Sequence, residues 1–258
     1  MSKFIDKLKR VSQAAPQAIG FRRAESVSAK ARIQLVVRMA AGDIENLADY
    51  AVGADAALVP ISKSSSGVEA LKKISVAMPD IPWGAWLGDI SAGKIKQMVA
   101  HGCDFVVFAA SSTPIVLPQN DETGKILEVE ASLNEGLLRA VNELPVDAVL
   151  VAPEQEGSGA LTWYQLMVFQ RFADLLAKPL LVSVRPDVTA NELQRLWEAG
   201  VDGVVVEAGA EGVKGLRQVI DKLTFPTPRK REKREALLPG IERESGAVAE
   251  AEEDEEED

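Results

Sequence analysis

Histidine and cysteine each occur only once in the 258 residues, as His101 and Cys103. A single cysteine excludes an internal disulfide framework and fits a reducing compartment, so we expect a cytoplasmic protein. Both residues stand directly before an apolar run, at the amino end of a predicted strand. The sequence therefore offers no His-based catalytic triad, no His or Cys zinc site and no candidate thiol nucleophile.

Long apolar runs are also lacking. No uninterrupted apolar stretch is long enough to span a bilayer, and residues 1–10 lack the apolar core of a signal peptide. The net charge of −10 belongs to one end of the chain, because after position 240 ten acidic residues face a single Arg243. The preceding residues are nearly neutral overall, so we expect no nucleic-acid partner and no long-range steering of a charged substrate.

Four short cassettes recur along the chain, each with a turn residue and an Asp directly before an apolar, β-branched run. The four aspartates are Asp55, Asp104, Asp147 and Asp202. Buried parallel strands begin in this way after a helix has returned the chain to the foot of a sheet. We predict that these aspartates lie at the amino ends of strands, where they cap the entering turns and take no part in catalysis.

The alternation predicts a single-domain α/β protein, a (β/α)8 TIM barrel over residues 16–224. Capping boxes at Ser132–Glu135 and Thr189–Glu192 predict two of the helix starts. The first βα unit is irregular, because residues 22–31 are too short for a full crossover helix. The predicted strands are 18–21, 33–37, 55–59, 81–87, 105–108, 148–151, 179–183 and 204–206.

Three segments lie outside this alternation. Residues 1–15 are predicted to form a basic amphipathic helix that closes the bottom of the barrel, with a membrane-surface anchor as the alternative. Residues 109–130 are predicted to insert an extra hairpin over the barrel mouth. Residues 225–258, first basic and then acidic, are predicted to be a disordered tail, because such a composition buries too little apolar area.

The cassettes, above all Ala199–Val206, resemble those of aldolase-type, phosphate-binding TIM barrels such as thiamine phosphate synthase, tryptophan synthase alpha chain and indole-3-glycerol phosphate synthase. The resemblance covers about residues 33–222 and specifies a superfamily, not one enzyme. It implies a phosphate-binding, glycine-rich turn after the last strand. Here Glu207–Gly212 brings two carboxylates, which would repel phosphate, and Val184–Pro186 replaces the glycine-rich turn after the seventh strand.

Charged side chains follow the carboxyl ends of several predicted strands, where a TIM barrel places its active site. The cations expected to hold an anionic ligand are Arg38, Lys63 and Arg185. The carboxylates expected to act as acid or base are Asp89, Glu154 and Glu207. These carboxylates could also bind Mg²⁺, but no spacing requires a metal, and the sequence assigns no cofactor.

Two functions fit these features. The first is a lyase or isomerase that acts on a small anionic metabolite at the C-terminal face of the barrel. The alternative is a non-catalytic barrel that serves as a binding or scaffold module with a charged interaction tail. Residues 161–176 are apolar around most of a helix, which exceeds the single stripe that an outer helix needs, and this predicts a homodimer.

Overall fold

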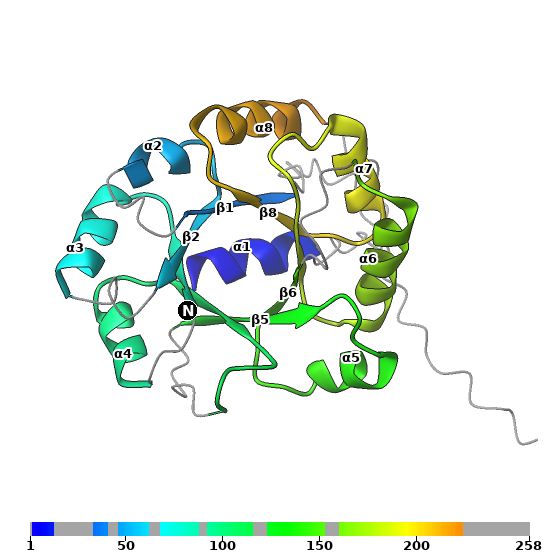
Figure 1. Cartoon of the computed structure of the whole chain (residues 1–258), viewed down its shortest axis with the longest axis horizontal. Coiled ribbons are helices and arrows are strands. Elements are labelled where there is room, and N and C mark those ends of the chain that lie inside the picture. Colours follow the sequence, from blue (N-terminus) through cyan, green and yellow to red (C-terminus); the bar gives the residue numbers. More distant parts are fainter. Residues whose placement is uncertain are drawn as a thin grey trace, which may run out of the picture.

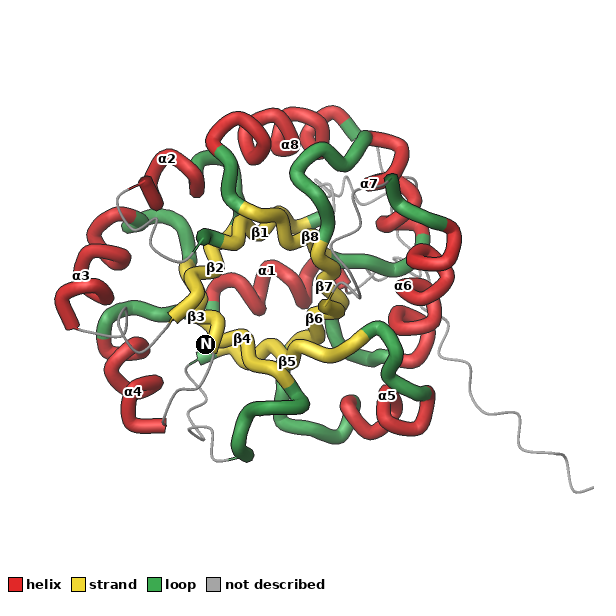
Figure 2. The backbone as a smooth tube through the Cα atoms, in the orientation of Figure 1, coloured by secondary structure: helices red, strands yellow, loops and turns green. Residues whose placement is uncertain are grey.

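Eight parallel strands close into a barrel in sequential order, β1 to β8, with β1 paired to β8. This arrangement comes from a computed structural model that describes residues 2–12, 33–40, 46–61, 68–87, 92–115, 123–152 and 160–223. Seven helices form an outer ring and α1 lies across the barrel opening (Figures 1 and 2). The predicted (β/α)8 TIM barrel is confirmed. None of the helices in the described ranges is both long and apolar enough to cross a lipid bilayer.

The strands are β1 (Gln34–Arg38), β2 (Ala56–Ile61), β3 (Trp83–Leu87), β4 (Phe105–Ala109), β5 (Gly124–Glu130), β6 (Ala148–Ala152), β7 (Leu180–Ser183) and β8 (Gly203–Glu207). The helices are α1 (Lys3–Ser12), α2 (Leu47–Ala51), α3 (Val68–Ala77), α4 (Ala92–Ala100), α5 (Glu135–Val141), α6 (Trp163–Leu175), α7 (Ala190–Glu198) and α8 (Ala210–Lys222). Each of the helices α2 to α8 follows a strand. The connection between β4 and β5 holds no helix in its described part.

Side-chain caps begin several of these helices. The predicted capping box of α7 is confirmed, with Thr189 and Glu192 each bonded to the other's backbone N–H. The box predicted at Ser132–Glu135 is wrong, because Asn134 is the N-cap of α5 and accepts from the backbone N–H of Leu137. The Ser132 hydroxyl donates instead to Glu130.

The fifth strand of the barrel corrects the prediction of a hairpin over 109–130. Residues 124–130 form β5, which pairs in parallel with β4 and β6. Lys125, Glu128 and Glu130 interrupt its apolar residues, and this made the segment resemble an exposed hairpin. With β5 in place the barrel closes without the predicted strand 18–21. That segment lies outside the described residues, as does the predicted tail 225–258.

Helix α1 closes the amino end of the barrel, as its amphipathic pattern predicted. Phe4, Ile5 and Leu8 are at most 2% exposed and join the inward-facing strand residues in one apolar cluster. The ring centroids of Phe4 and Phe105 are 4.8 Å apart. The apolar side of α1 is therefore occupied by the barrel core, which argues against the alternative of a membrane anchor.

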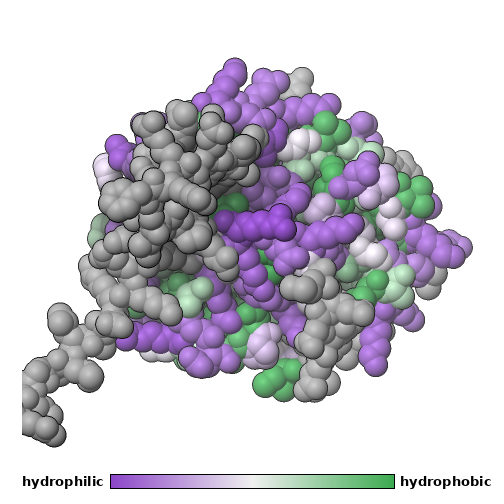
Figure 3. Space-filling view, turned by 180° about the vertical axis from the view of Figure 1, so that it is seen from behind, coloured by the Kyte–Doolittle hydropathy of each residue, from purple (hydrophilic) through white to green (hydrophobic). Residues whose placement is uncertain are grey.

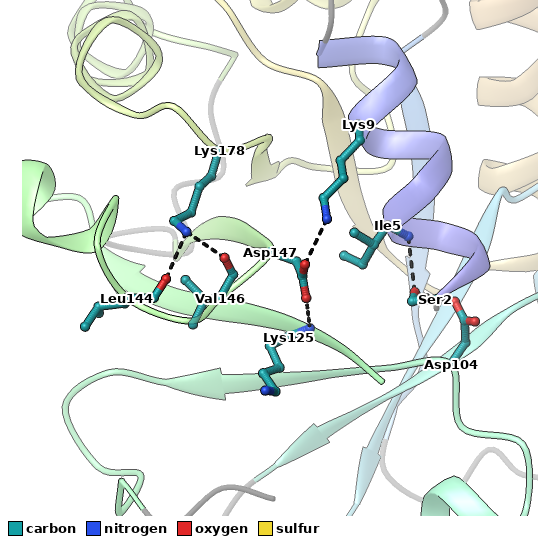
Figure 4. Close-up of polar contacts among 9 residues, drawn as sticks. All are labelled: Ser2, Ile5, Lys9, Asp104, Lys125, Leu144, Val146, Asp147 and Lys178. Atoms are coloured by element: carbon teal, nitrogen blue, oxygen red, sulfur yellow. Dashed lines mark hydrogen bonds and ion pairs between the residues drawn. The ribbon is translucent and has the colours of Figure 1, made fainter. Parts of the chain in front are cut away.

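Polar contacts with two of the cassette aspartates hold α1 in place (Figure 4). The carboxylate of Asp104 accepts hydrogen bonds from Ser2 Oγ, Lys3 N and Phe4 N at 2.8–2.9 Å. At the other end of the helix, Lys9 Nζ lies 3.0 Å from Asp147 Oδ1. Asp104 thus satisfies backbone N–H groups that the first turn of a helix leaves without a partner.

Three of the four cassette aspartates, Asp147 among them, bind the neighbouring strand. Asp55 accepts from Leu35 N at 2.9 Å, Asp147 from Lys125 N at 3.0 Å, and Asp202 from Leu180 N at 2.9 Å. The aspartates therefore lie at the amino end of the barrel, as predicted. Asp55, Asp147 and Asp202 stabilise the start of the preceding strand, which differs from the predicted cap of the turn before their own strand.

Inward-facing side chains stack in layers across the barrel. The register of the strand pairs, combined with a stagger of one residue per strand, places side chains from alternate strands at one level. Three successive layers, from the amino end upward, are apolar: Ala56, Phe105, Ala148 and Gly203; Val36, Gly84, Ile126 and Leu181; Leu58, Val107, Leu150 and Val205. These layers make the interior a packed core that separates α1 from the opposite, carboxyl end.

Candidate functional site

The next layer toward the carboxyl end is polar. Its four inward-facing residues come from the odd-numbered strands: Arg38 on β1, Trp86 on β3, Glu128 on β5 and Ser183 on β7. We call these four residues the polar layer. Above them, the even-numbered strands contribute Pro60, Ala109, Ala152 and Glu207. A polar layer directly above three apolar ones lies where TIM barrels carry out their chemistry.

Trp86 joins two charged residues of the polar layer. The guanidinium carbon of Arg38 lies 3.5 Å from the centroid of the Trp86 ring. A guanidinium stacked in this way gains about 0.5–2 kcal/mol and is held in one plane. Trp86 also hydrogen-bonds the side chain of Glu128, for which the indole N–H is its only donor. One ring therefore orients both a cation and a carboxyl group.

Glu128 has the electrostatic character of an acid or base. Burial raises the pKa of its carboxyl group, while the charge of Arg38 and the hydrogen bond from Trp86 partly oppose this rise. A carboxyl group whose pKa is raised toward the working pH can both accept and donate a proton. Perturbed groups of this kind gather at functional sites, although ion pairs elsewhere also produce them.

The structure describes three of the six residues predicted for the site. Arg38 and Glu207 are partners in the pairing of β1 with β8, so these two positions are neighbours. Arg185 lies two residues beyond the end of β7, and its guanidinium is 3.4 Å from Asp187. Lys63, Asp89 and Glu154 lie outside the described residues, so their roles stay predictions.

Glu128 and Trp86 were not among the predicted site residues. The sequence predicts Glu128 in the hairpin and Trp86 in an apolar strand. A signal was present, because Glu128 stands among Ile126, Leu127 and Val129, all of which are buried. A lone carboxylate inside such a run indicates a strand that turns one polar side chain toward the barrel axis.

His101 and Cys103 lie in the turn before β4, at the end of the barrel opposite to the polar layer. Burial raises the pKa of the Cys103 thiol to about 12, so a reactive thiolate does not form near neutral pH. No three His, Cys, Asp or Glu residues of the described ranges are grouped closely enough to hold a metal ion.

Figure 3 shows the face of the molecule opposite to the one that faces the reader in Figure 1. Hydrophilic residues gather near the centre of this face.

Comparisons with known proteins extend the description of the fold. No family model and no curated protein matches the sequence. Two variants of the tryptophan synthase alpha-subunit from Pyrococcus furiosus are similar in structure at 12% identity. One has a TM-score of 0.59 over 74% of this chain and 98% of that chain, and the other 0.58 over 73% and 96%. A structure from Aquifex aeolicus VF5 reaches a TM-score of 0.60 at 12% identity, over 85% of this chain and 97% of that chain. Similarity at this identity shows the fold alone, which is the TIM barrel that the Asp cassettes predicted.

Proposed function

We propose that this barrel binds a small anionic metabolite at its carboxyl end and transfers a proton to or from it, as a lyase or isomerase does. The observation that carries the proposal is the arrangement of Arg38 and Glu128 around Trp86. Arg38 supplies the positive charge for the anion, and Glu128 acts as the general acid or base. Arg185 and Glu207 lie at the rim as further candidates for binding and proton transfer. Lys63, Asp89 and Glu154, which lie outside the described residues, stay candidates from the sequence.

Loss of the Arg38 charge tests this proposal. We expect Arg38→Met to weaken anion binding by about 10-fold to 100-fold, because a hydrogen bond to a charged group contributes about 1.5–3 kcal/mol. The measurement is a screen of small carboxylates and phosphate esters by ligand-detected NMR, followed by titration. Arg195→Met is the matched control, because Arg195 lies on α7 and pairs with Glu198. Equal binding by Arg38→Met and wild type would contradict the proposal.

The alternative function is a non-catalytic binding or scaffold module, with the charged tail as a second contact. An apolar surface on α6 favours it. Trp163, Tyr164 and Met167 are 78%, 63% and 67% exposed, while Val168 and Phe172 on the other side of the helix are buried. Exposed apolar residues grouped in this way are typical of interaction surfaces. A barrel that binds none of the anions and yet forms complexes through α6 would fit this function better.

We propose that the partner of α6 is a second copy of the chain. Light scattering at micromolar concentration is then expected to give the mass of a dimer. Met167→Glu should convert it to a monomer, because a charge would be buried in the interface without a partner. Val76→Glu should leave the dimer intact, since Val76 is an exposed apolar residue on a different helix, α3 (80%). A monomeric wild-type protein would refute the dimer.

We place the protein in the cytoplasm. The support is the single cysteine, which is buried and carries no disulfide. Such a thiol suits a reducing compartment.

A further inference from the structure

We propose that the barrel mouth takes a monocarboxylate and rejects phosphate esters. This inference rests on the proposed function, since it names the class of anion that the site at Arg38 binds. It depends on three features of the described residues: the charges around the polar layer, the geometry of its donors, and the size of the side chains above it.

The charges around the mouth favour an anion with a single negative charge. In the polar layer and the layer above it, Arg38 is the one cation among the inward-facing residues, and Glu128 and Glu207 are carboxyl groups. Glu207 is next to Arg38 in the strand pairing. A phosphate ester carries nearly two negative charges at neutral pH, and within these two layers only the guanidinium of Arg38 would neutralise them, next to the carboxylate of Glu207. A carboxylate needs only the one cation.

The donors of the polar layer match a planar carboxylate. A guanidinium presents two parallel N–H groups in its plane, which fit the two oxygens of a carboxylate, and stacking on Trp86 fixes that plane. Ser183, at the same level on β7, brings a hydroxyl that can donate to an oxygen. Because burial raises the pKa of Glu128, its carboxyl group is more readily protonated and can donate a proton to the bound anion.

The side chains above the polar layer limit the size of the ligand less than a core layer would. Pro60, Ala109 and Ala152 are short, whereas the layer below the polar one consists of Leu58, Val107, Leu150 and Val205. Short side chains at this level fill less of the barrel cross-section. A ligand of a few heavy atoms bound at this level would lie next to the level of Arg38.

Matched pairs of anions test the inference on the full-length protein. Propionate and ethyl phosphate form one pair, and benzoate and phenyl phosphate form the other; affinities are measured by ligand-detected NMR titration at constant ionic strength. We expect the carboxylate of each pair to bind at least about tenfold more tightly than the phosphate. Such a difference corresponds to about 1.4 kcal/mol. Glu207→Gln should reduce this difference in affinity between carboxylate and phosphate, because it should strengthen phosphate binding. Glu143→Gln, which changes an exposed carboxylate beyond the end of α5, should leave the gap unchanged.

The outcomes separate this inference from the proposed function. If phosphates bind as tightly as carboxylates and Arg38→Met weakens both, the site stands and the monocarboxylate inference falls. A gap that Glu207→Gln does not change would also overturn the inference, because the rejection would then have another cause. If no anion of the panel binds, or if binding survives Arg38→Met, both the inference and the proposed function fail.

Discussion

Phe4→Ala is expected to lower the free energy of unfolding by about 3–5 kcal/mol, as substitutions of buried aromatic side chains by alanine do. Phe4 is fully buried inside the amino end of the barrel and packs against the ring of Phe105. Its removal would leave a cavity between α1 and the first apolar layer. The surrounding strands are held together by hydrogen bonds around the closed barrel, so they cannot move inward to fill the space.

Urea denaturation measured by circular dichroism checks this value. Lys7→Ala is the matched control, because Lys7 is an exposed residue of the same helix, and we expect it to change stability by less than about 0.5 kcal/mol. An effect of Phe4→Ala as small as that of Lys7→Ala would mean that α1 does not close the barrel.

The loss of stability expected for Asp104→Asn lies between those of Phe4→Ala and Lys7→Ala. An amide oxygen can still accept some of the three hydrogen bonds that the Asp104 carboxylate accepts at the start of α1.

The predicted strands that the structure reproduces share one property, which is that almost all their residues are buried. In β1, β6 and β8, which contain Val36, Val149 and Val205, both faces of the strand lie against apolar groups. One face packs in the barrel interior and the other packs against the outer helices. A strand with two apolar faces leaves an unbroken apolar run in the sequence. The Asp cassettes then mark the amino ends of β2, β4, β6 and β8, because a carboxylate there binds a neighbouring N–H group.

The same reasoning explains why β5 and the polar layer were missed. The inward face of β5 changes from Gly124 and Ile126 to Glu128 and Glu130 along one strand, so its sequence matches neither a buried strand nor a half-buried one. Charged residues on the inward face break the apolar pattern that identifies a strand. The contact between Arg38 and Trp86 joins β1 to β3, two strands that are not neighbours, and depends on the barrel stagger. The sequence alone gives no value for that stagger.

Gly84→Ala is expected to destabilise the barrel by about 3 kcal/mol, at the upper end of the range for overpacked cores. A Cβ atom at this position would overlap the Cε2 and Cδ2 atoms of the Phe105 ring. Phe105 is fully buried, and its other contacts include the ring of Phe4, so it cannot turn away without displacing α1. Gly84 is therefore required by the close approach of an aromatic ring from the layer below.

A second substitution distinguishes this overlap from a general destabilisation of β3 by alanine. Phe105→Leu removes the ring atoms that the new Cβ would meet, so the double variant should be more stable than Gly84→Ala alone, with a coupling energy of about 1–3 kcal/mol. Gly215→Ala is the control, because a Cβ atom there would meet nothing within 4 Å and the position lies inside α8. It should raise stability by up to about 1 kcal/mol, since glycine is unfavourable inside a helix. Additive effects of Gly84→Ala and Phe105→Leu would show that the two residues do not share the space, and the layer order of the barrel would then be wrong at this level.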